Sequence, residues 1–184
     1  MSYRGREIES KWLVPNTTLE EVSRLLSRVV NMEKNILIGQ SKDMYWTIGN
    51  GRKGQFLRLR DTGSIRQITV KARDRETPND RMELEVESTQ SMHLINRLIT
   101  CVMGKANASL TKTYHVFFLE NGATVSVYRV DGLPHTVVEI EARSTEELHK
   151  LNAQYIPLLF DHYLGTYEAA GSLYEMLVSK EVPV

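Results

Sequence analysis

The sequence predicts an α+β fold: a closed eight-stranded antiparallel β-barrel, or tunnel, with a charged interior and helices packed outside. Several short stretches alternate charged and apolar residues, which is the two-residue period of a β-strand. Amphipathic helical stretches lie between and after these strands and need an apolar sheet surface to pack on. Short turns connect successive strands. This favours antiparallel pairing, and eight antiparallel strands commonly close into a barrel.

The first half of the chain predicts a series of strands interrupted by two helices. After a first strand over residues 5–13, Thr17 or Thr18 begins a helix, because Glu20 or Glu21 three residues later completes a capping box. The remaining elements expected here are strands over 34–48, 55–60, 65–73 and 81–87 and a helix over 90–103.

The second half predicts a hairpin, one more strand and C-terminal helices. Asn121-Gly122 suits the tight turn of the hairpin. Ser144 begins a helix that runs to about Gln154 or a little beyond, and Pro157 interrupts or kinks it because proline has no N–H to donate. Residues 1–184 are expected to form one domain, with the helices from about residue 144 packing on the barrel or capping it. The elements expected here are strands over 112–119, 124–130 and 137–142 and a last helix over 166–179.

The composition is that of a soluble globular protein. Hydrophobic residues make up 41% of the 184 residues and charged residues 25%, and the formal net charge is +0. No global field therefore steers the chain onto DNA or an anionic membrane, and neither partner is expected. The lone Cys101 excludes an internal disulfide and a cysteine-based zinc site and favours a reducing compartment. We expect a cytoplasmic protein, since the chain shows neither a signal peptide nor a transmembrane run. We expect it to be a monomer or a homodimer.

The charged strand faces are expected to point into the barrel. On most antiparallel sheets charged residues face water, but here the helices need the apolar strand faces for packing. The charges are also sorted by sign within each strand, whereas a solvated face more often mixes signs. Buried charges are tolerated when they are paired, hydrogen-bonded or bound to ions. The carboxylate pairs are Glu7 and Glu9, Glu83 and Glu85, and Glu139 and Glu141, and the cationic pairs are Arg58 and Arg60, and Lys71 and Arg73.

This charge pattern suits a phosphate chain and its metal ion. Carboxylates without histidine or cysteine partners favour hard divalent cations such as Mg²⁺ or Mn²⁺. Arginine binds phosphate oxygens in two-point geometry, and lysine adds a point charge. Charge neutralisation and positioning are most of what phosphoryl transfer requires. We therefore expect a small-molecule di- or triphosphate substrate with a divalent metal cofactor.

The ordered motifs resemble the CYTH superfamily, the triphosphate tunnel metalloenzymes. Glu7-Ile8-Glu9-Ser10-Lys11 resembles the ExExK signature of that family. The resemblance continues in order over nearly the whole chain, so it is more specific than ExExK alone. The later matching segments are Asp43-Met44-Tyr45, Phe56-Leu57-Arg58-Leu59-Arg60, Thr69-Val70-Lys71, Arg81-Met82-Glu83-Leu84-Glu85, Lys112, Val138-Glu139-Ile140-Glu141 and Ser172-Leu173-Tyr174.

The resemblance implies an eight-stranded antiparallel tunnel and a set of site residues. Family members include inorganic, nucleoside, thiamine and RNA triphosphatases and class IV adenylyl cyclases. By similarity, the catalytic residues are Glu7, Glu9, Lys11 and Glu141. The implied metal ligands are Glu7, Glu9, Glu83, Glu85, Glu139 and Glu141, and the implied triphosphate-binding residues are Lys11, Arg58, Arg60, Lys71, Arg73 and Lys112.

Two positions depart from the family pattern. Tyr114 stands where the family often has an arginine, and Tyr128 where it often has an aspartate. The favoured hypothesis is a metal-dependent hydrolase of tripolyphosphate, a nucleoside triphosphate or thiamine triphosphate. A class IV adenylyl cyclase is the second hypothesis. The third is a non-catalytic binder of a triphosphate or nucleotide, for which the two tyrosines are the best support.

Overall fold

The computed structural model describes residues 6–30, 36–48, 55–73, 80–162 and 167–168 of the 184-residue chain. Antiparallel strands dominate it, with three α-helices in the described part. No helix in those ranges is both long and apolar enough to cross a bilayer. The elements are β1 (Arg6–Pro15), α1 (Leu19–Val30), β2 (Ile36–Thr47), β3 (Phe56–Asp61), β4 (Arg66–Arg73), β5 (Asp80–Ser88), α2 (Met92–Met103), β6 (Ala108–Phe118), β7 (Thr124–Val130), β8 (His135–Ala142), α3 (Thr145–His162) and β9 (Tyr167–Glu168).

The predicted closed barrel of eight strands is wrong. The strands form one nine-stranded sheet in the order β5-β4-β3-β2-β6-β7-β8-β1-β9, with a further pairing of β5 with β1. The short strand β9 pairs with Trp12 and Leu13, on the edge of β1 that β8 leaves open. A strand edge accepts one neighbour at each position. The pairing of β5 with β1 therefore cannot extend along the whole of β1, and the sheet order ends at β5 and β9.

The described chain packs as two compact units, which we call unit 1 and unit 2. Unit 1 contains β2 from Ser41, β3, β4, β5, α2 and the start of β6. Unit 2 contains β1 from Glu7, α1, β2 as far as Gln40, β6 from Lys112, β7, β8, α3 and β9. Each unit has a hydrophobic cluster of its own.

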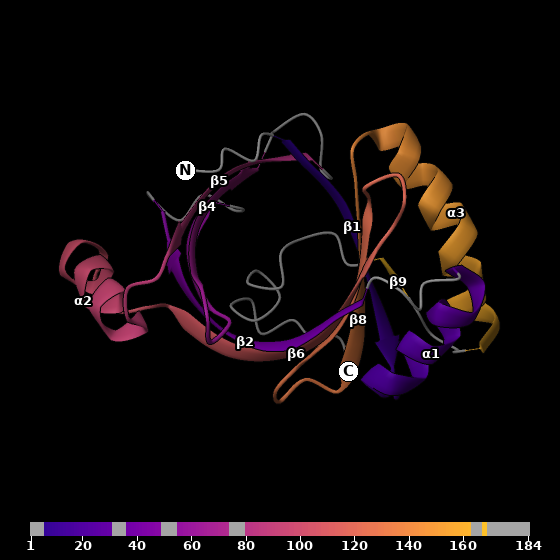
Figure 1. The fold of residues 1–184 in the computed structure, drawn as a ribbon, viewed down its shortest axis with the longest axis horizontal. Helices are drawn as coiled ribbons and strands as arrows, with labels where there is room; N and C mark the ends of the chain where they lie inside the picture. The colour runs from indigo at the N-terminus through magenta and orange to yellow at the C-terminus, as the bar shows by residue number, and fades with distance from the viewer. Residues whose placement is uncertain (1–5, 31–35, 49–54, 74–79, 163–166, 169–184) are drawn as a thin grey trace. The chain divides into compact units, whose positions relative to one another are not determined.

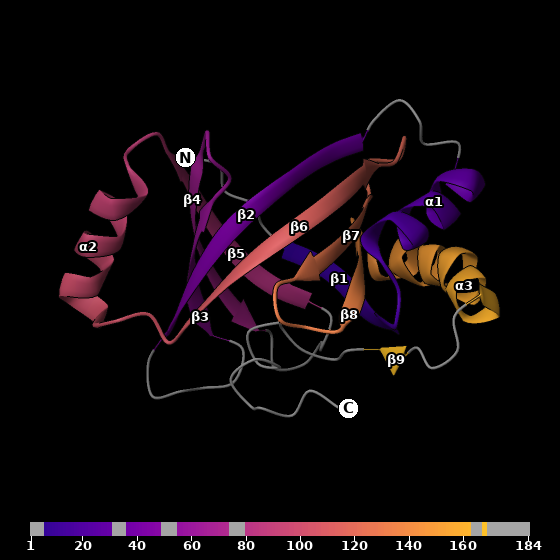
Figure 2. The same cartoon turned by 90° about the horizontal axis from the view of Figure 1, so that it is seen from below.

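In unit 2, α1 and α3 cover one face of the strands. The two helices lie side by side, α1 over β7 and α3 over β8 (Figures 1 and 2). Their buried side chains, among them Leu26 and Leu148, pack on Val127, Val138 and Ile140 of the sheet. Alternate residues of these strands point to the opposite face, so the helices fix which face carries the charged side chains.

Strand β1 is anchored to α3 by hydrogen bonds on the helix-covered face. The Ser10 hydroxyl donates to Asn152 Oδ1 at 2.7 Å, and the Trp12 indole N–H reaches the same oxygen at 3.2 Å. Because side chains alternate along a strand, Glu9 and Lys11 point to the other face.

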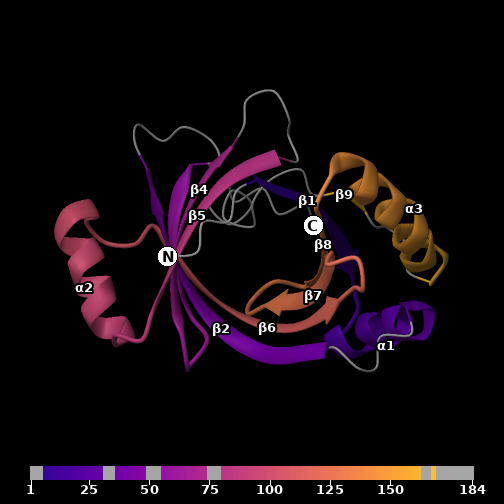
Figure 3. The same cartoon turned by 45° about the horizontal axis from the view of Figure 1, so that its top comes forward.

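In unit 1, α2 packs on the apolar face of the strands. Ile95 of α2 is buried with Trp46 of β2 and Leu59 of β3, and Figure 3 shows the helix on this one side of β2, β4 and β5. The cover is incomplete, because Leu84 on β5 is 47% exposed and Val102 on α2 is 86% exposed. The prediction that helices cover the apolar strand faces therefore holds for the neighbourhood of Trp46 and does not extend to Leu84.

The helix starts follow the sequence signals. Thr18 and Glu21 form the predicted capping box: the Thr18 N–H donates to Glu21 Oε2 at 2.8 Å, and the Glu21 N–H donates to Thr18 Oγ1 at 3.2 Å. Hydrogen bonds from the Thr18 backbone and hydroxyl lower the pKa of Glu21. Ser144 caps α3 in the same way, accepting from the Glu147 N–H at 3.1 Å.

The third helix extends further than predicted, and Pro157 does not interrupt it. Helix α3 continues through Pro157 to His162. The residues around the proline explain this, because Tyr155, Ile156 and Leu159 are buried in the unit 2 cluster and their packing outweighs one lost backbone hydrogen bond. The last predicted helix, 166–179, is wrong at Tyr167–Glu168, which form β9, and residues 169–179 lie outside the described part.

Replacing a buried helix leucine should destabilise the protein far more than replacing an exposed one. Leu148 of α3 is 0% exposed in the unit 2 cluster, whereas Leu98 of α2 is 61% exposed. Leu148→Ala should lower the free energy of unfolding by about 2–5 kcal/mol because it leaves a cavity. Leu98→Ala, the matched control, should leave it nearly unchanged. Urea denaturation measures both, and equal losses would contradict the packing of α3 described above.

Candidate functional site

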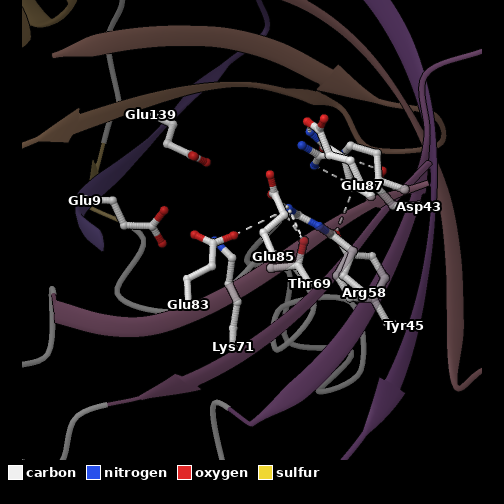
Figure 4. A network of polar contacts seen from close by, with 12 residues as sticks. Glu9, Asp43, Tyr45, Arg58, Thr69, Lys71, Glu83, Glu85, Glu87 and Glu139 are labelled. Atoms are coloured by element: carbon white, nitrogen blue, oxygen red, sulfur yellow. Dashed lines mark hydrogen bonds and ion pairs between the residues drawn. The ribbon is translucent and has the colours of Figure 1, made fainter. Parts of the chain in front are cut away.

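Unit 1 arranges its polar side chains as a grid on the face opposite α2. The registers place Asp43 opposite Arg60 and Tyr45 opposite Arg58. The next strands continue the same rows. Arg58 lies opposite Thr69, which lies opposite Glu85, and Lys71 lies opposite Glu83. Figure 4 shows the side chains of Arg58, Thr69, Lys71, Glu83 and Glu85 converging.

The grid is buried, as the sequence predicted for the charged strand faces. Asp43 is 0% exposed, and Arg58, Lys71, Glu83 and Glu85 are each below 9%, whereas Arg60 is half-buried. Glu87, at the end of the same row on β5, is exposed. Ions removed from water in this way must be compensated by partners or by a ligand.

Asp43 neutralises Arg60. The guanidinium donates from Nε to Oδ1 at 2.9 Å and from Nη2 to Oδ2 at 2.8 Å, which is the two-point geometry of a strong ion pair. The Tyr45 hydroxyl also donates to Asp43 Oδ2, at 3.2 Å. Arg60 is therefore held by protein groups. The sequence motif contained Asp43 and Tyr45, but their role in holding Arg60 was not predicted.

Arg58 is buried with weaker compensation. Its Nη2 donates to Thr69 Oγ1 at 3.1 Å, but the nearest oxygens of Glu83 and Glu85 lie 3.8 Å and 4.0 Å away. Those distances are too long for hydrogen bonds. Nε of Arg58 is buried and has no hydrogen-bond partner among the described residues. Lys71 Nζ is likewise 3.7 Å from Glu83 Oε2. Arg58 therefore has donor capacity that the neighbouring carboxylates do not use fully.

Unit 2 gathers carboxylates around one lysine. Glu9 lies directly opposite Glu141, and Lys11 opposite Glu139, in the β1–β8 ladder. Lys11 Nζ is 2.5 Å from Glu9 Oε1 and 3.1 Å from Glu139 Oε2, so its ammonium bridges the two carboxylates. Glu9 and Lys11 are buried, while Glu139 and Glu141 are half-buried. Like charges directly opposite on a sheet repel, so this cluster gains from any added cation.

The carboxylate oxygens of unit 2 are chemically suited to bind a hard divalent ion. Three carboxylates face one lysine among Glu9, Lys11, Glu139 and Glu141, which leaves an excess of negative charge. Oxygen ligands of this kind suit Mg²⁺ or Mn²⁺. Within the described ranges, no three acidic, histidine or cysteine side chains surround one point as metal ligands. Lys11 occupies the position between Glu9 and Glu139, so an ion bound between those two carboxylates would have to replace this ammonium.

Tyr128 and Lys112 extend the unit 2 cluster. The Tyr128 hydroxyl donates to Glu139 Oε2 at 3.0 Å, and Lys112 Nζ lies 4.7 Å from the centre of the Tyr128 ring. Tyr114 lies opposite Tyr128 in the β6–β7 ladder. Its ring packs against Gly39, where a Cβ atom added to the glycine would come within 2.7 Å of Tyr114 Oη. At the two positions where the sequence resemblance led us to expect charged residues, the tyrosines supply a hydrogen bond and ring contacts. The contact to Glu139 was not predicted.

Two predicted site residues lie outside the part of the chain whose side chains are described. Glu7 and Arg73 occupy β1 and β4 by their backbone, but their side chains are not placed. The remaining predicted residues fall into two groups. Glu9, Lys11, Lys112, Glu139 and Glu141 belong to unit 2, and Arg58, Arg60, Lys71, Glu83 and Glu85 belong to unit 1.

Solved structures share this fold, although no family model and no curated protein sequence matches the chain. The Hippeastrum protein HpAC1, described as a proposed adenylyl cyclase with a dominant triphosphatase activity, matches with a TM-score of 0.66 at 13% identity, over 96% of this chain and 97% of that one. A Vibrio parahaemolyticus protein described as a proposed adenylate cyclase matches with a TM-score of 0.63 at 12% identity, over 93% and 98%. The chain has the CYTH-type fold.

The CYTH-type fold is also found in a protein not named for an enzymatic activity. A chain from the Schizosaccharomyces pombe Mediator head module matches with a TM-score of 0.60 at 10% identity, over 89% of this chain and all of that one (100%). The resemblance that the motifs predicted is thus confirmed at the level of the fold. Because one fold can serve different functions, the activity must be argued from the residues.

Removing the charge of Asp43 should be costly. Asp43→Asn leaves Arg60 without its ion partner in a mostly buried position, which should reduce the free energy of unfolding by about 3 kcal/mol. Glu146→Gln is the matched control, because it breaks the 2.8 Å ion pair with Lys150 on the surface of α3, where both side chains are at least 74% exposed. Guanidinium denaturation compares them. A loss for Asp43→Asn as small as that for the control would contradict the buried ion pair.

Stability should fall at alkaline pH in part through Tyr45. Burial of the phenol, with the nearby Asp43 charge, raises the pKa of Tyr45 well above its ordinary value of 10.0. The folded protein therefore keeps a proton that the unfolded chain releases as the pH rises past about 10, so folding stability decreases there. In Tyr45→Phe, the free energy of unfolding should decline less steeply between about pH 9 and pH 11. Equal slopes for the variant and the wild-type protein would contradict the raised pKa.

Proposed function

We propose that this chain is a divalent-metal-dependent hydrolase that releases phosphate from a triphosphate compound. The observation that carries the proposal is Arg58. Its guanidinium is about nine-tenths buried, its carboxylate contacts are 3.8 Å and 4.0 Å long, and its Nε has no hydrogen-bond partner within the described residues. A buried, incompletely compensated guanidinium is suited to an anion with several oxygens, and a phosphate chain supplies them.

Arg58 and Lys71 are the proposed phosphate-binding residues of unit 1. Arg58 supplies a planar fork and Lys71 a point charge, from neighbouring strands of the same grid. Arg60 has a different role, because Asp43 already accepts hydrogen bonds from its Nε and Nη2. Arg60 would contribute a fixed positive field.

Glu9, Glu139 and Glu141 are the proposed ligands of Mg²⁺ or Mn²⁺ in unit 2. Their excess of negative charge over Lys11 supports this assignment. A divalent ion held by these residues would supply positive charge and a bound water of lowered pKa. Lys11, which contacts Glu9 and Glu139, would neutralise charge that develops on the phosphates.

The fold match also favours a second activity. HpAC1 is described both as a proposed adenylyl cyclase and as having a dominant triphosphatase activity. The same buried cations and carboxylates would serve a cyclase, in which the ribose 3′ oxygen replaces water as the nucleophile. The products separate the two: ADP and phosphate for hydrolysis, and cyclic AMP and pyrophosphate for cyclisation.

Loss of a buried site charge should abolish most turnover. The assay is phosphate release from tripolyphosphate, ATP, GTP and thiamine triphosphate with Mg²⁺ or Mn²⁺. Arg58→Ala and Glu9→Gln should each reduce the turnover rate by at least about tenfold, because each group stabilises charge in the transition state. Arg97→Ala is the matched control, since Arg97 is an exposed cation on α2. It should match the wild-type protein.

Three results would contradict this proposal. Turnover in Arg58→Ala and Glu9→Gln equal to that of Arg97→Ala would remove these residues from the reaction. Cyclic AMP as the main product from ATP would reassign the chain as a cyclase. Tight binding of all four compounds without turnover, with either metal, would make it a non-catalytic binder.

A further inference from the structure

Tyr128 contacts two predicted site residues at once. It lies on β7 and is 4% exposed. In the β7–β8 ladder it is opposite Val137, so Glu139 is its diagonal neighbour on the same face of the sheet, within reach of a long aromatic side chain. The hydroxyl donates to Glu139 Oε2 at 3.0 Å.

The Glu139 oxygen that Tyr128 contacts also receives Lys11. Lys11 Nζ lies 3.1 Å from the same Oε2. Donors from β1 and β7 therefore converge on one carboxylate oxygen of β8, and together they orient the Glu139 carboxylate. If Lys11 leaves when a metal ion binds, the Tyr128 hydroxyl remains as a fixed, uncharged donor to that oxygen.

The ring of Tyr128 has a separate contact. Lys112 Nζ lies 4.7 Å from the ring centre, within the range of a cation–π interaction. Lys112 is itself only 8% exposed and comes from β6. The ring thus positions a buried cation, and the hydroxyl positions a carboxylate.

We propose that Tyr128 is a positioning residue with two separable roles: its hydroxyl sets the affinity of Glu139 for a divalent ion, and its ring sets the affinity of Lys112 for phosphate. This inference rests on the proposed function, because it takes Glu139 as a metal ligand and Lys112 as a phosphate ligand. Groups that hydrogen-bond to a metal ligand orient it, and their loss typically weakens metal binding by about 10- to 100-fold.

Three variants separate the two roles. Tyr128→Phe removes the hydroxyl and keeps the ring over Lys112. Tyr128→Leu removes both. Tyr114→Phe is the matched control, because it removes a hydroxyl that comes from the facing strand and lies against Gly39. The melting temperature of each metal-free variant reports whether the fold is retained.

The probes are Mn²⁺ alone and tripolyphosphate alone, each titrated calorimetrically into the full-length protein. Tyr128→Phe should weaken Mn²⁺ binding by about tenfold and leave tripolyphosphate binding within about twofold of wild type. Tyr128→Leu should weaken Mn²⁺ binding to a similar extent. It should also weaken tripolyphosphate binding about three- to tenfold relative to Tyr128→Phe. Tyr114→Phe should change neither affinity.

The outcomes distinguish this inference from the function on which it rests. A wild-type protein that binds neither probe contradicts the proposed function and the inference together. If wild type binds both probes and Tyr128→Phe retains its Mn²⁺ affinity, the positioning role of the hydroxyl is wrong while the proposed function stands. If Tyr128→Leu binds tripolyphosphate as well as Tyr128→Phe does, the role of the ring is wrong. Equal loss of Mn²⁺ affinity in Tyr114→Phe would show a general packing effect and overturn the assignment.

Discussion

The burial of charged side chains on one face of the sheet is the constraint on which the rest of this structure depends. Asp43, Glu83 and Glu85 share the interior of unit 1 with Arg58 and Lys71, and Glu9 is buried beside Lys11 in unit 2. Burying a charged group costs desolvation free energy that an exposed group does not lose, so each buried charge must be compensated by a partner. The strand registers supply that compensation by placing opposite charges on adjacent strands.

The degree of compensation differs between residues, and this difference carries the functional argument. Arg60 donates two hydrogen bonds to Asp43, and Lys11 bridges Glu9 and Glu139. Arg58 is held mainly by a neutral hydroxyl, that of Thr69, with carboxylates beyond hydrogen-bonding distance. A site that pairs some ions tightly and leaves others loosely paired keeps its fold without a ligand and retains binding energy for one. Arg58 is the loosely compensated cation, and in unit 2 the three carboxylates Glu9, Glu139 and Glu141 outnumber Lys11. These groups have the chemistry that phosphate and a divalent cation require.

The sequence predicted the local features of this site and missed its tertiary ones. The two-residue period of Glu9-Ser10-Lys11 and of the later strands correctly predicted buried charged faces, and Thr18 with Glu21 correctly predicted the start of α1. Strand order, the short strand β9 and the continuation of α3 through Pro157 depend on packing between distant segments, which a local pattern does not encode. The contacts of Asp43 with Arg60 and of Tyr128 with Glu139 follow from cross-strand register. They could be anticipated only once β2 was paired with β3, and β7 with β8.

The most direct test of the central claim is a crystal structure of the protein with Mn²⁺ and a non-hydrolysable triphosphate analogue, using anomalous scattering to locate the metal. The account predicts a manganese peak within coordination distance of Glu9, Glu139 or Glu141, and phosphate oxygens hydrogen-bonded to Arg58 and Lys71. Well-occupied metal and phosphate density bound only to exposed residues, with Arg58 and the unit 2 carboxylates arranged as they are without ligand, would contradict it.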